Sequence, residues 1–219
     1  MALLEKIVSK ILPENVWNSY QIYKTQKGWD KCEKEFSLKR KIDINSVPVP
    51  HINKRNIINE YSKKYEIKVL IETGTFLGIM VNSMKNKFEK IYSVELSEIL
   101  YKRAVKKFKN DNNIKIVFGN SEIVLPELLS YIDQPCLFWL DGHYSGGITA
   151  KALLETPIIK ELSTIFEHKI KSHLILIDDA RLFIGTRDYP DIVEIKKFID
   201  QQNQNYKLEI KDDIIIISK

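Results

Sequence analysis

The sequence predicts an α/β protein whose core is a Rossmann-like, doubly wound and mostly parallel seven-stranded sheet. Three observations predict this fold. From residue 52 onward, short runs rich in β-branched residues alternate with helical patterns, which is typical of parallel strands joined by helical crossovers. Only Asp212 and Asp213 separate the last two runs, so these should form a C-terminal antiparallel strand pair at one edge of the sheet. Before residue 52 the pattern is helical, which predicts an N-terminal helical appendage.

The appendage should contain two helices followed by a linker. Residues 2–12 place their apolar side chains on one helical stripe, and a second helical stretch carries Trp17 and Tyr20. The prolines of the segment DINSVPVPH end the helical pattern. We therefore expect an appendage and linker over residues 1–51 and a second domain over residues 52–219. The apolar stripe has three interpretations: packing on the body of the protein, packing on a second copy in a homodimer, or peripheral contact with a membrane surface.

The elements of the second domain follow from the same alternation. The expected strands are residues 67–72, 90–95, 114–119, 135–141, 173–179, 206–211 and 213–219. The expected helices are residues 54–65, 79–88, 97–110, 121–132, 156–170 and 191–202. Pro157 and Pro190 favour helix starts at their positions, because proline fits the first helical turn.

Length and composition describe an ordinary globular protein of 219 residues, 44% hydrophobic and 29% charged. The net charge is +5, but basic and acidic residues alternate, which indicates a solvated surface and no nucleic-acid partner. Cys32 and Cys136 fit no metal or redox spacing. No apolar run reaches the roughly 18–20 residues of a membrane span, and no signal peptide is recognisable. We therefore expect a cytoplasmic protein without a membrane span.

The turn after the first expected strand reads ETGTFLG. In doubly wound sheets, ligands bind outside the carboxyl ends of the strands. Gly74 and Gly78 would let the backbone approach a ligand, with N–H groups of the following helix pointing at it. The alternative interpretation is a tight turn that needs glycine for its positive φ.

Polar residues also lie at the ends of the next two expected strands. Glu95 comes 21 residues after Gly74, a spacing at which an acid can accept hydrogen bonds from both ribose hydroxyls of a nucleoside. Asn120 and Ser121 follow the third strand, where an adenine amino group could be recognised, although both are also good helix caps.

Three aspartates lie at the ends of the fourth and fifth expected strands. Asp141 ends one strand, and Asp178 and Asp179 end the next. A single aspartate in this position is usually a cap or turn residue, but all three should meet at the same edge of the sheet, with His143 beside them. This grouping favours a functional site.

Five motifs, ETGTFLG, YSVE, GNSEIVLPEL, LFWLDGHY and LILIDD, resemble in their order and spacing those of class I S-adenosylmethionine-dependent methyltransferases. Within that class they are similar to metal-dependent small-molecule O-methyltransferases of the catechol and caffeoyl-CoA type, and to macrolide and sugar O-methyltransferases. The resemblance covers about residues 52–219 and leaves the appendage unaccounted for.

The resemblance implies a role for each matching position. The methionine part of the cofactor S-adenosylmethionine would be lined by Glu72, Gly74, Thr75 and Gly78. The ribose would be held by Glu95, and the adenine would lie near Asn120 and Ser121. The sulfonium would lie by Asp141, and Mg²⁺ would be bound by Asp141, Asp178 and Asp179. Such an ion holds the acceptor oxygen and lowers its pKa.

Two features depart from the catechol-type pattern. That pattern has an Asp–Asn pair where this chain has Asp178 and Asp179, and the loop DGHYSGG replaces a lysine-containing loop. His143 is therefore a candidate catalytic base beside Asp141, because the unperturbed pKa of histidine lies near neutrality. The alternative is that His143 hydrogen-bonds the substrate or the backbone.

Three further residues follow strand ends at the same edge and are candidates for contact with the acceptor: Tyr144, Arg181 and Arg187. Arginines there would suit a phosphate or carboxylate group. Surface arginines are also commonly just solvated.

The function expected from these features is S-adenosylmethionine-dependent O-methylation of a small-molecule or sugar hydroxyl, in a surface glycan or a glycosylated metabolite. One alternative is an NAD-dependent nucleotide-sugar oxidoreductase, although ETGTFLG lacks the G-x-G-x-x-G spacing that a pyrophosphate needs. Another is a non-catalytic partner protein with the same fold.

Overall fold

A computed structural model describes residues 12–43, 48–142, 156–202 and 205–219. The chain divides into two compact units, Met1–Ser46 and Val47–Lys219, and each unit is described by itself. The separation of an appendage over residues 1–51 from the rest stays a prediction.

The first unit contains the long helix α2, Glu14–Ile42, which begins after Pro13. The three basic residues Lys39, Arg40 and Lys41 lie in its last turn, where cations interact favourably with the helix dipole. This helix accounts for the second predicted helical stretch. The helix predicted over residues 2–12 lies outside the described residues. Among the described helices, none is long and apolar enough to cross a membrane.

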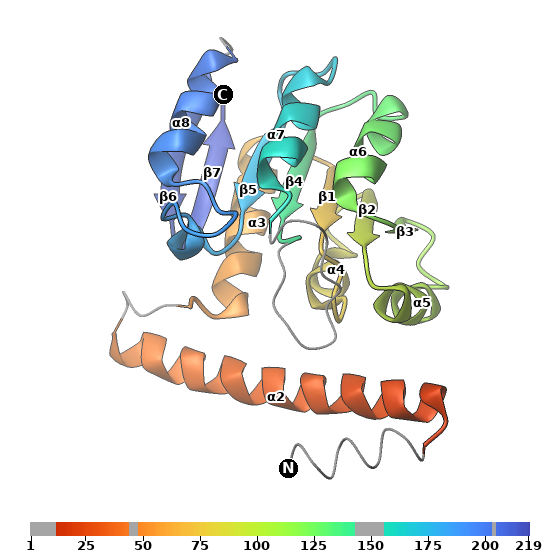
Figure 1. The fold of residues 1–219 in the computed structure, drawn as a ribbon. Helices are drawn as coiled ribbons and strands as arrows, with labels where there is room; N and C mark the ends of the chain where they lie inside the picture. Colours follow the sequence, from red (N-terminus) through yellow and green to blue (C-terminus); the bar gives the residue numbers. More distant parts are fainter. Residues whose placement is uncertain (1–11, 44–47, 143–155, 203–204) are drawn as a thin grey trace. The chain divides into compact units, whose positions relative to one another are not determined.

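The second unit contains a seven-stranded sheet with the order β3-β2-β1-β4-β5-β7-β6 (Figure 1). Its strands are β1 Val69–Thr73, β2 Lys90–Glu95, β3 Ile114–Phe118, β4 Cys136–Leu140, β5 Leu174–Ile177, β6 Lys207–Lys211 and β7 Ile214–Ser218. The first five strands pair in parallel, whereas β7 is antiparallel to both β5 and β6. The predicted mostly parallel sheet and its C-terminal antiparallel pair are therefore confirmed.

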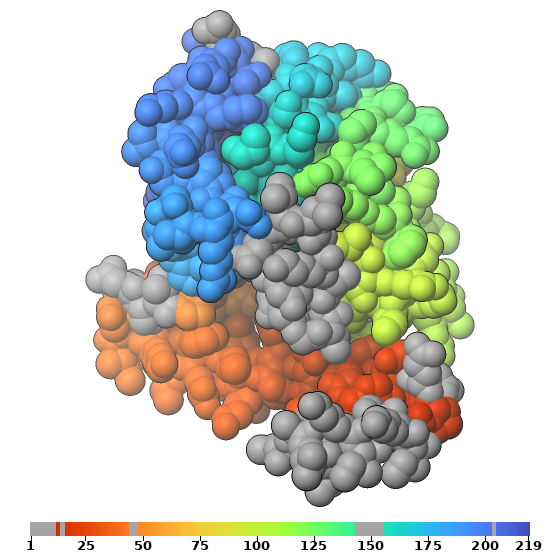
Figure 2. Space-filling view, in the orientation of Figure 1, coloured from red at the N-terminus to blue at the C-terminus, as the bar shows by residue number. Residues whose placement is uncertain are grey.

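Helices cover both faces of the sheet. They are α3 His51–Lys64, α4 Ile79–Met84, α5 Glu98–Lys107, α6 Ser121–Ser130, α7 Ile158–Glu167 and α8 Ile192–Gln201, with a short 3₁₀ helix η1 at Ala180–Leu182. Residues of α6, α7 and α8 pack on one face, and their outer sides form the green-to-blue surface in Figure 2. Residues of α3, α4 and α5 pack on the other face. Most helices are shorter than predicted, but α3 begins earlier, directly after Pro50.

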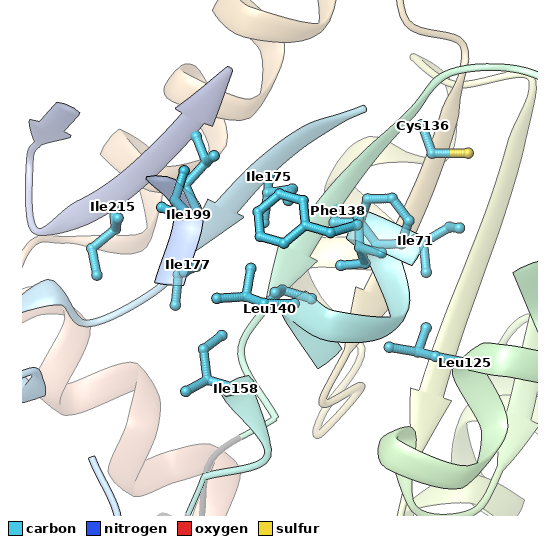
Figure 3. Packing of buried hydrophobic residues seen from close by; sticks show 14 of the residues in the cluster. Ile71, Leu125, Cys136, Phe138, Leu140, Ile158, Ile175, Ile177, Ile199 and Ile215 are labelled. Carbon is cyan, nitrogen blue, oxygen red and sulfur yellow. The ribbon is translucent and has the colours of Figure 1, made fainter. Parts of the chain in front are cut away.

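The strands are buried on both faces because their side chains alternate between two cores. In β4, Phe138 and Leu140 point toward α6, α7 and α8, whereas Leu137 and Trp139 point toward α3 and α4. Figure 3 shows Phe138 among the isoleucines of neighbouring strands. This two-sided burial explains why the strands read as apolar runs in the sequence.

The strand order reverses between β1 and β4. From this point the chain proceeds outward through β2 and β3 on one side and through β5 on the other. Such a switch point separates the loops that follow two neighbouring strands and opens a crevice at their carboxyl ends. The turns after β1, β2 and β4, and the residues after β5, therefore define the place to look for a site.

Candidate functional site

The turn after β1 lies close to the turn after β4. The N–H groups of Gly74 and Thr75 both donate to the carbonyl of Val94 in β2, at 2.9 and 3.2 Å. Gly74 has φ +90°, and a Cβ built on it would lie 2.4 Å from the backbone oxygen of Asp141. Glycine is therefore required at position 74 both by conformation and by the close approach of the two turns.

Gly78 also has a positive φ, +65°, and precedes α4. A Cβ at this position would meet the ring of Phe108 at 2.8 Å. Both glycines thus have the backbone conformation that a tight turn requires. Their contact with a cofactor stays a prediction.

The carboxylate of Glu72, in β1, is fully buried and belongs to a chain of polar groups. The hydroxyl of Ser93 in β2 donates to Glu72, and the hydroxyl oxygens of Thr75 and Ser93 are 2.6 Å apart. Parallel pairing places Glu72 opposite Ser93. Burial raises the pKa of Glu72 well above its usual range, the Ser93 hydroxyl opposes this shift, and the negative charge of Asp141 adds to it.

Glu95 ends β2 with both carboxylate oxygens held by backbone groups. One oxygen accepts from the N–H of Phe76 at 2.7 Å, and the other accepts from the N–H of Ser97 at 2.8 Å. Burial raises the pKa of Glu95, and these backbone donors oppose that shift. Phe76 has φ +48°, an uncommon conformation for a residue with a side chain. The turn after β1 is thus tied directly to the end of β2.

Beyond β3, the side chain of Asn120 caps α6 by accepting from the N–H of Glu122 at 3.0 Å. Ser121, the first residue of α6, is buried. The cap that the sequence allows is therefore present. Recognition of an adenine by these two residues stays a prediction. Next to them, the half-exposed ring of Phe118 contacts Tyr101, with ring centroids 5.3 Å apart.

Asp141 follows β4 and is partly buried. Its N–H donates to the carbonyl of Thr73 at 3.1 Å, which again joins the ends of β4 and β1. Its charge contributes to the raised pKa of Glu72 and to that of Lys54. The structure thus places Asp141 in the same electrostatic environment as the residues after β1 and β5. His143 and Tyr144 lie outside the described residues.

Asp178 and Asp179 follow β5 and both bind the ammonium group of Lys54, a residue of α3. Lys54 Nζ lies 2.6 Å from Asp178 Oδ2 and 3.1 Å from Asp179 Oδ1, and all three side chains are about nine-tenths buried. Burial alone would lower the pKa of Lys54, but the two carboxylates outweigh it and raise the pKa. Burial raises the pKa of Asp178, and Lys54 opposes that shift.

Asp179 has φ +55° and also accepts from Arg181 Nη1 at 2.7 Å. The same guanidinium binds Asp213, in the turn between β6 and β7. Arg181 is therefore part of an ion-pair network, and a contact with an acceptor would have to use its other N–H groups. Arg187 is exposed and has φ +56°. Contacts of both arginines with an acceptor stay predictions.

Two charged residues at the site were missed in the reading of the sequence: Lys54 and Glu161. Lys54 lines up with Ile57, Ile58 and Tyr61 on the buried face of α3. Glu161, in α7, is only 1% exposed and lines a small hollow together with Asp178. A charged residue at an apolar position of a helical stripe is the signal that could have identified both, because an ionised side chain is rarely buried without a partner.

The site thus has two parts with different chemistry. Around the ends of β1, β2 and β4, burial raises the pKa values of the carboxylates, and neighbouring negative charges raise that of Glu72 further. A positively charged ligand would therefore be stabilised there. At the end of β5, the carboxylates are already neutralised by Lys54 and Arg181. Among the residues that the structure describes, no group of three or more His, Cys, Asp or Glu side chains is arranged to hold a metal ion.

Comparison with known proteins adds to this geometry. No protein-family model and no curated protein sequence matches the chain. Solved structures do match, at low sequence identity. The O-methyltransferase of Bacillus cereus, in complex with S-adenosylhomocysteine, aligns at 11% identity over 99% of this chain and 97% of its own, with a TM-score of 0.56.

Two further structures extend the comparison. The O-methyltransferase TomG of Streptomyces achromogenes, involved in tomaymycin synthesis and in complex with S-adenosylmethionine, aligns at 13% identity over 94% of this chain and 97% of its own, with a TM-score of 0.54. The S-adenosylhomocysteine-bound methyltransferase PaMTH1 of Podospora anserina aligns at 17% identity over 75% and 77% of the two chains, with a TM-score of 0.50. The chain therefore has the fold of the class I S-adenosylmethionine-dependent methyltransferases and resembles their O-methyltransferase members.

Proposed function

We propose that the protein is an S-adenosylmethionine-dependent O-methyltransferase. The observation that carries the proposal is the group of acids at the ends of three adjacent strands, Glu72 of β1, Glu95 of β2 and Asp141 after β4. Burial raises the pKa values of Glu72 and Glu95, and a cationic ligand beside these carboxylates would stabilise their charged form. S-adenosylmethionine supplies an electrophilic methyl group on a positively charged sulfonium and also carries a positively charged α-amino group.

The residues present fit this cofactor. Backbone groups of Phe76, Ser97 and Leu96 donate to the Glu95 carboxylate, which has about four acceptor sites and can therefore still accept from a ribose hydroxyl. Glu72 and Asp141 would lie beside the methionine part, with Gly74, Thr75 and Gly78 forming the turn. Asn120 and Ser121 would lie by the adenine, where the Phe118 ring offers an apolar surface.

The acceptor in this proposal is a hydroxyl of a small molecule or a sugar. His143 would take the proton of that hydroxyl as its oxygen attacks the methyl group in line, and the positioning of the two reactants would supply much of the rate. Tyr144, Arg181 and Arg187 would contact the acceptor. We place this reaction in the cytoplasm, without a nucleic-acid partner, with a homodimer or a peripheral membrane contact as the two roles open to the N-terminal segment. Mg²⁺ is not part of the proposed reaction, because Lys54 already neutralises Asp178 and Asp179.

An NAD-dependent oxidoreductase is less well supported. The turn after β1 has a single glycine before Gly78, and the carboxylates around it would repel a pyrophosphate. A non-catalytic partner protein would bind S-adenosylmethionine without turnover, or would not bind it at all.

Titration calorimetry with S-adenosylhomocysteine, with NAD⁺ as the comparison ligand, tests the proposal. We expect micromolar binding of S-adenosylhomocysteine and none of NAD⁺. Glu95→Gln should weaken binding about 10- to 100-fold, since hydrogen bonds to a charged acceptor contribute roughly 1.5–3 kcal/mol. The matched control is Glu89→Gln, which removes a carboxylate paired with Lys68 on the surface and should leave the affinity unchanged. Binding of NAD⁺ alone, or of neither ligand, would refute the proposal.

A further inference from the structure

We propose that Lys54 is a built-in substitute for the divalent metal ion at this site, so that its ammonium group, and not Mg²⁺, provides the positive charge beside Asp178 and Asp179. The part of this proposal that concerns methyl transfer rests on the proposed function. The part that concerns cation binding does not, because it depends only on three side chains and their distances.

The geometry assigns the position to Lys54. Its Nζ lies 2.6 Å from one oxygen of Asp178 and 3.1 Å from one oxygen of Asp179, so it contacts two of the three carboxylates that the resemblance assigns to a metal. The other oxygen of Asp178, Oδ1, accepts from the N–H of Asp179 at 2.8 Å. Arg181 Nη1 lies 2.7 Å from the same oxygen of Asp179 that binds Lys54.

A metal ion at this place would therefore compete with two resident cations. Mg²⁺ needs near-octahedral oxygen ligands at roughly 2.0–2.1 Å. It could reach the carboxylates only if Lys54 left, and this would leave an ammonium group in a buried position without its partners. The residues present do not fit a divalent cation while α3 is in place.

The position of α3 makes this arrangement part of the fold. Lys54 lies one turn before Ile57 and Ile58, which are 2% and 0% exposed and pack in the core beneath the sheet. Docking of these two isoleucines therefore carries the lysine to the end of β5. The same packing that stabilises the helix thus supplies the cation to the site.

The test is to treat the protein with a chelator, remove the chelator and titrate the protein with Mn²⁺. Electron paramagnetic resonance or calorimetry measures the binding. Wild-type protein should show no Mn²⁺ binding that depends on Asp178, as judged against Asp178→Asn. Lys54→Met should bind Mn²⁺ at least about tenfold more tightly than wild type, because the variant removes a positive charge that repels the ion at short range in a partly buried site. Lys54→Gln is the second variant, and Lys85→Met, which removes a lysine from its pair with Asp111, is the control.

The outcomes are distinct. Tight Mn²⁺ binding by wild type that is lost in Asp178→Asn would overturn the proposal. A folded Lys54→Met or Lys54→Gln variant that binds Mn²⁺ no better than wild type would also overturn it. If neither variant folds, the wild-type titration decides. S-adenosylhomocysteine titration of the wild-type protein keeps the two proposals apart, since absence of that binding would reject the methyltransferase and leave the manganese result interpretable.

Discussion

Titratable side chains are buried at both ends of the neighbouring strands β4 and β5, as charged groups at the carboxyl ends and as neutral groups at the amino ends. At the carboxyl ends, Lys54, Asp178 and Asp179 are charged groups that neutralise one another. At the amino ends, His168 and His173 form a neutral hydrogen-bonded chain. Figure 3 shows Cys136 and Leu140 at the two ends of β4, with the apolar core between them.

The order of donors in the neutral chain follows from one backbone group. The N–H of Cys136 donates to His173 Nδ1 at 3.0 Å, so the proton of His173 must be on Nε2. That group donates to His168 Nδ1 at 2.8 Å, and His168 Nε2 donates to the carbonyl of Leu129 at 3.0 Å. Every ring nitrogen of the pair thus has a partner, and the chain links the starts of β4 and β5 to α6.

The contrast between these two clusters gives a criterion for distinguishing a functional cluster of titratable side chains from a structural one. Neutral groups that satisfy one another completely leave nothing for a ligand to do, so the two histidines are explained by stability. Charged groups around the ends of β1, β2 and β4 are not balanced in this way, as the raised pKa values of Glu72 and Glu95 indicate. Burial of a titratable group is therefore not sufficient evidence for a site.

Among substitutions at the two ends, the largest loss of stability should come from the carboxyl ends of β4 and β5, where Lys54 binds Asp178 and Asp179. Lys54→Met removes from two buried carboxylates the ammonium group that binds both, and we expect a loss of about 3–5 kcal/mol in the free energy of unfolding. The double variant Lys54→Met/Asp178→Asn should recover part of this loss, because one of the unpaired charges is removed. Urea denaturation in the presence of a chelator measures both. Equal stability of wild type and Lys54→Met would show that this ion pair is not buried as described.

The next largest loss of stability should come from the histidine pair at the amino ends of β4 and β5 when the pH falls. Burial lowers the pKa of His173 to about 4 from its ordinary value, and the nearby His168 adds to this shift. The unfolded chain then binds more protons than the folded protein between about pH 6.5 and pH 4, so stability should fall by about 3 kcal/mol over this range as pH decreases. Above pH 6.5 the contribution is fully present.

His173→Gln should flatten this dependence while lowering stability at neutral pH. His51, whose pKa is lowered to about 3, contributes a loss of the same sign. Because wild type and variant both retain His51, the difference between their slopes of unfolding free energy against pH reports on His173 alone. Parallel curves of unfolding free energy against pH would contradict the assignment of the acid sensitivity to His173.

The smallest effect should come from the chain of polar side chains formed by Glu72, Ser93 and Thr75 at the turn after β1. Thr75→Val removes the contact between Thr75 and Ser93 at 2.6 Å and should lower stability by about 1 kcal/mol, since a buried hydroxyl loses its partner. The matched control is Ser163→Ala, which removes an exposed hydroxyl bonded to Glu167. Thermal unfolding of both measures the difference. An equal change in the two variants would mean that the chain to Glu72 adds nothing beyond a surface hydrogen bond.

The sequence alone determined the fold and the edge of the sheet that carries the site. The strands could be predicted because their burial on both faces produces continuous apolar runs, and Gly74, Glu95, Asp141 and Asp178 lie at or directly after their ends. The C-terminal antiparallel pair could be predicted from the short connection at Asp212 and Asp213, whereas the strand order is known from the structure. These are local signals, so a single sequence is enough to contain them.

The tertiary structure alone decided which groups meet. Lys54 and Asp178 are 124 residues apart, and their contact depends on how α3 docks against the sheet. Likewise, parallel register places Glu72 opposite Ser93. Such pairings arise from packing between elements that are distant in the sequence, and they produce no periodic pattern of residues from which they could be predicted. The sequence therefore predicted three aspartates at one edge, and packing turned two of them into the partners of a lysine.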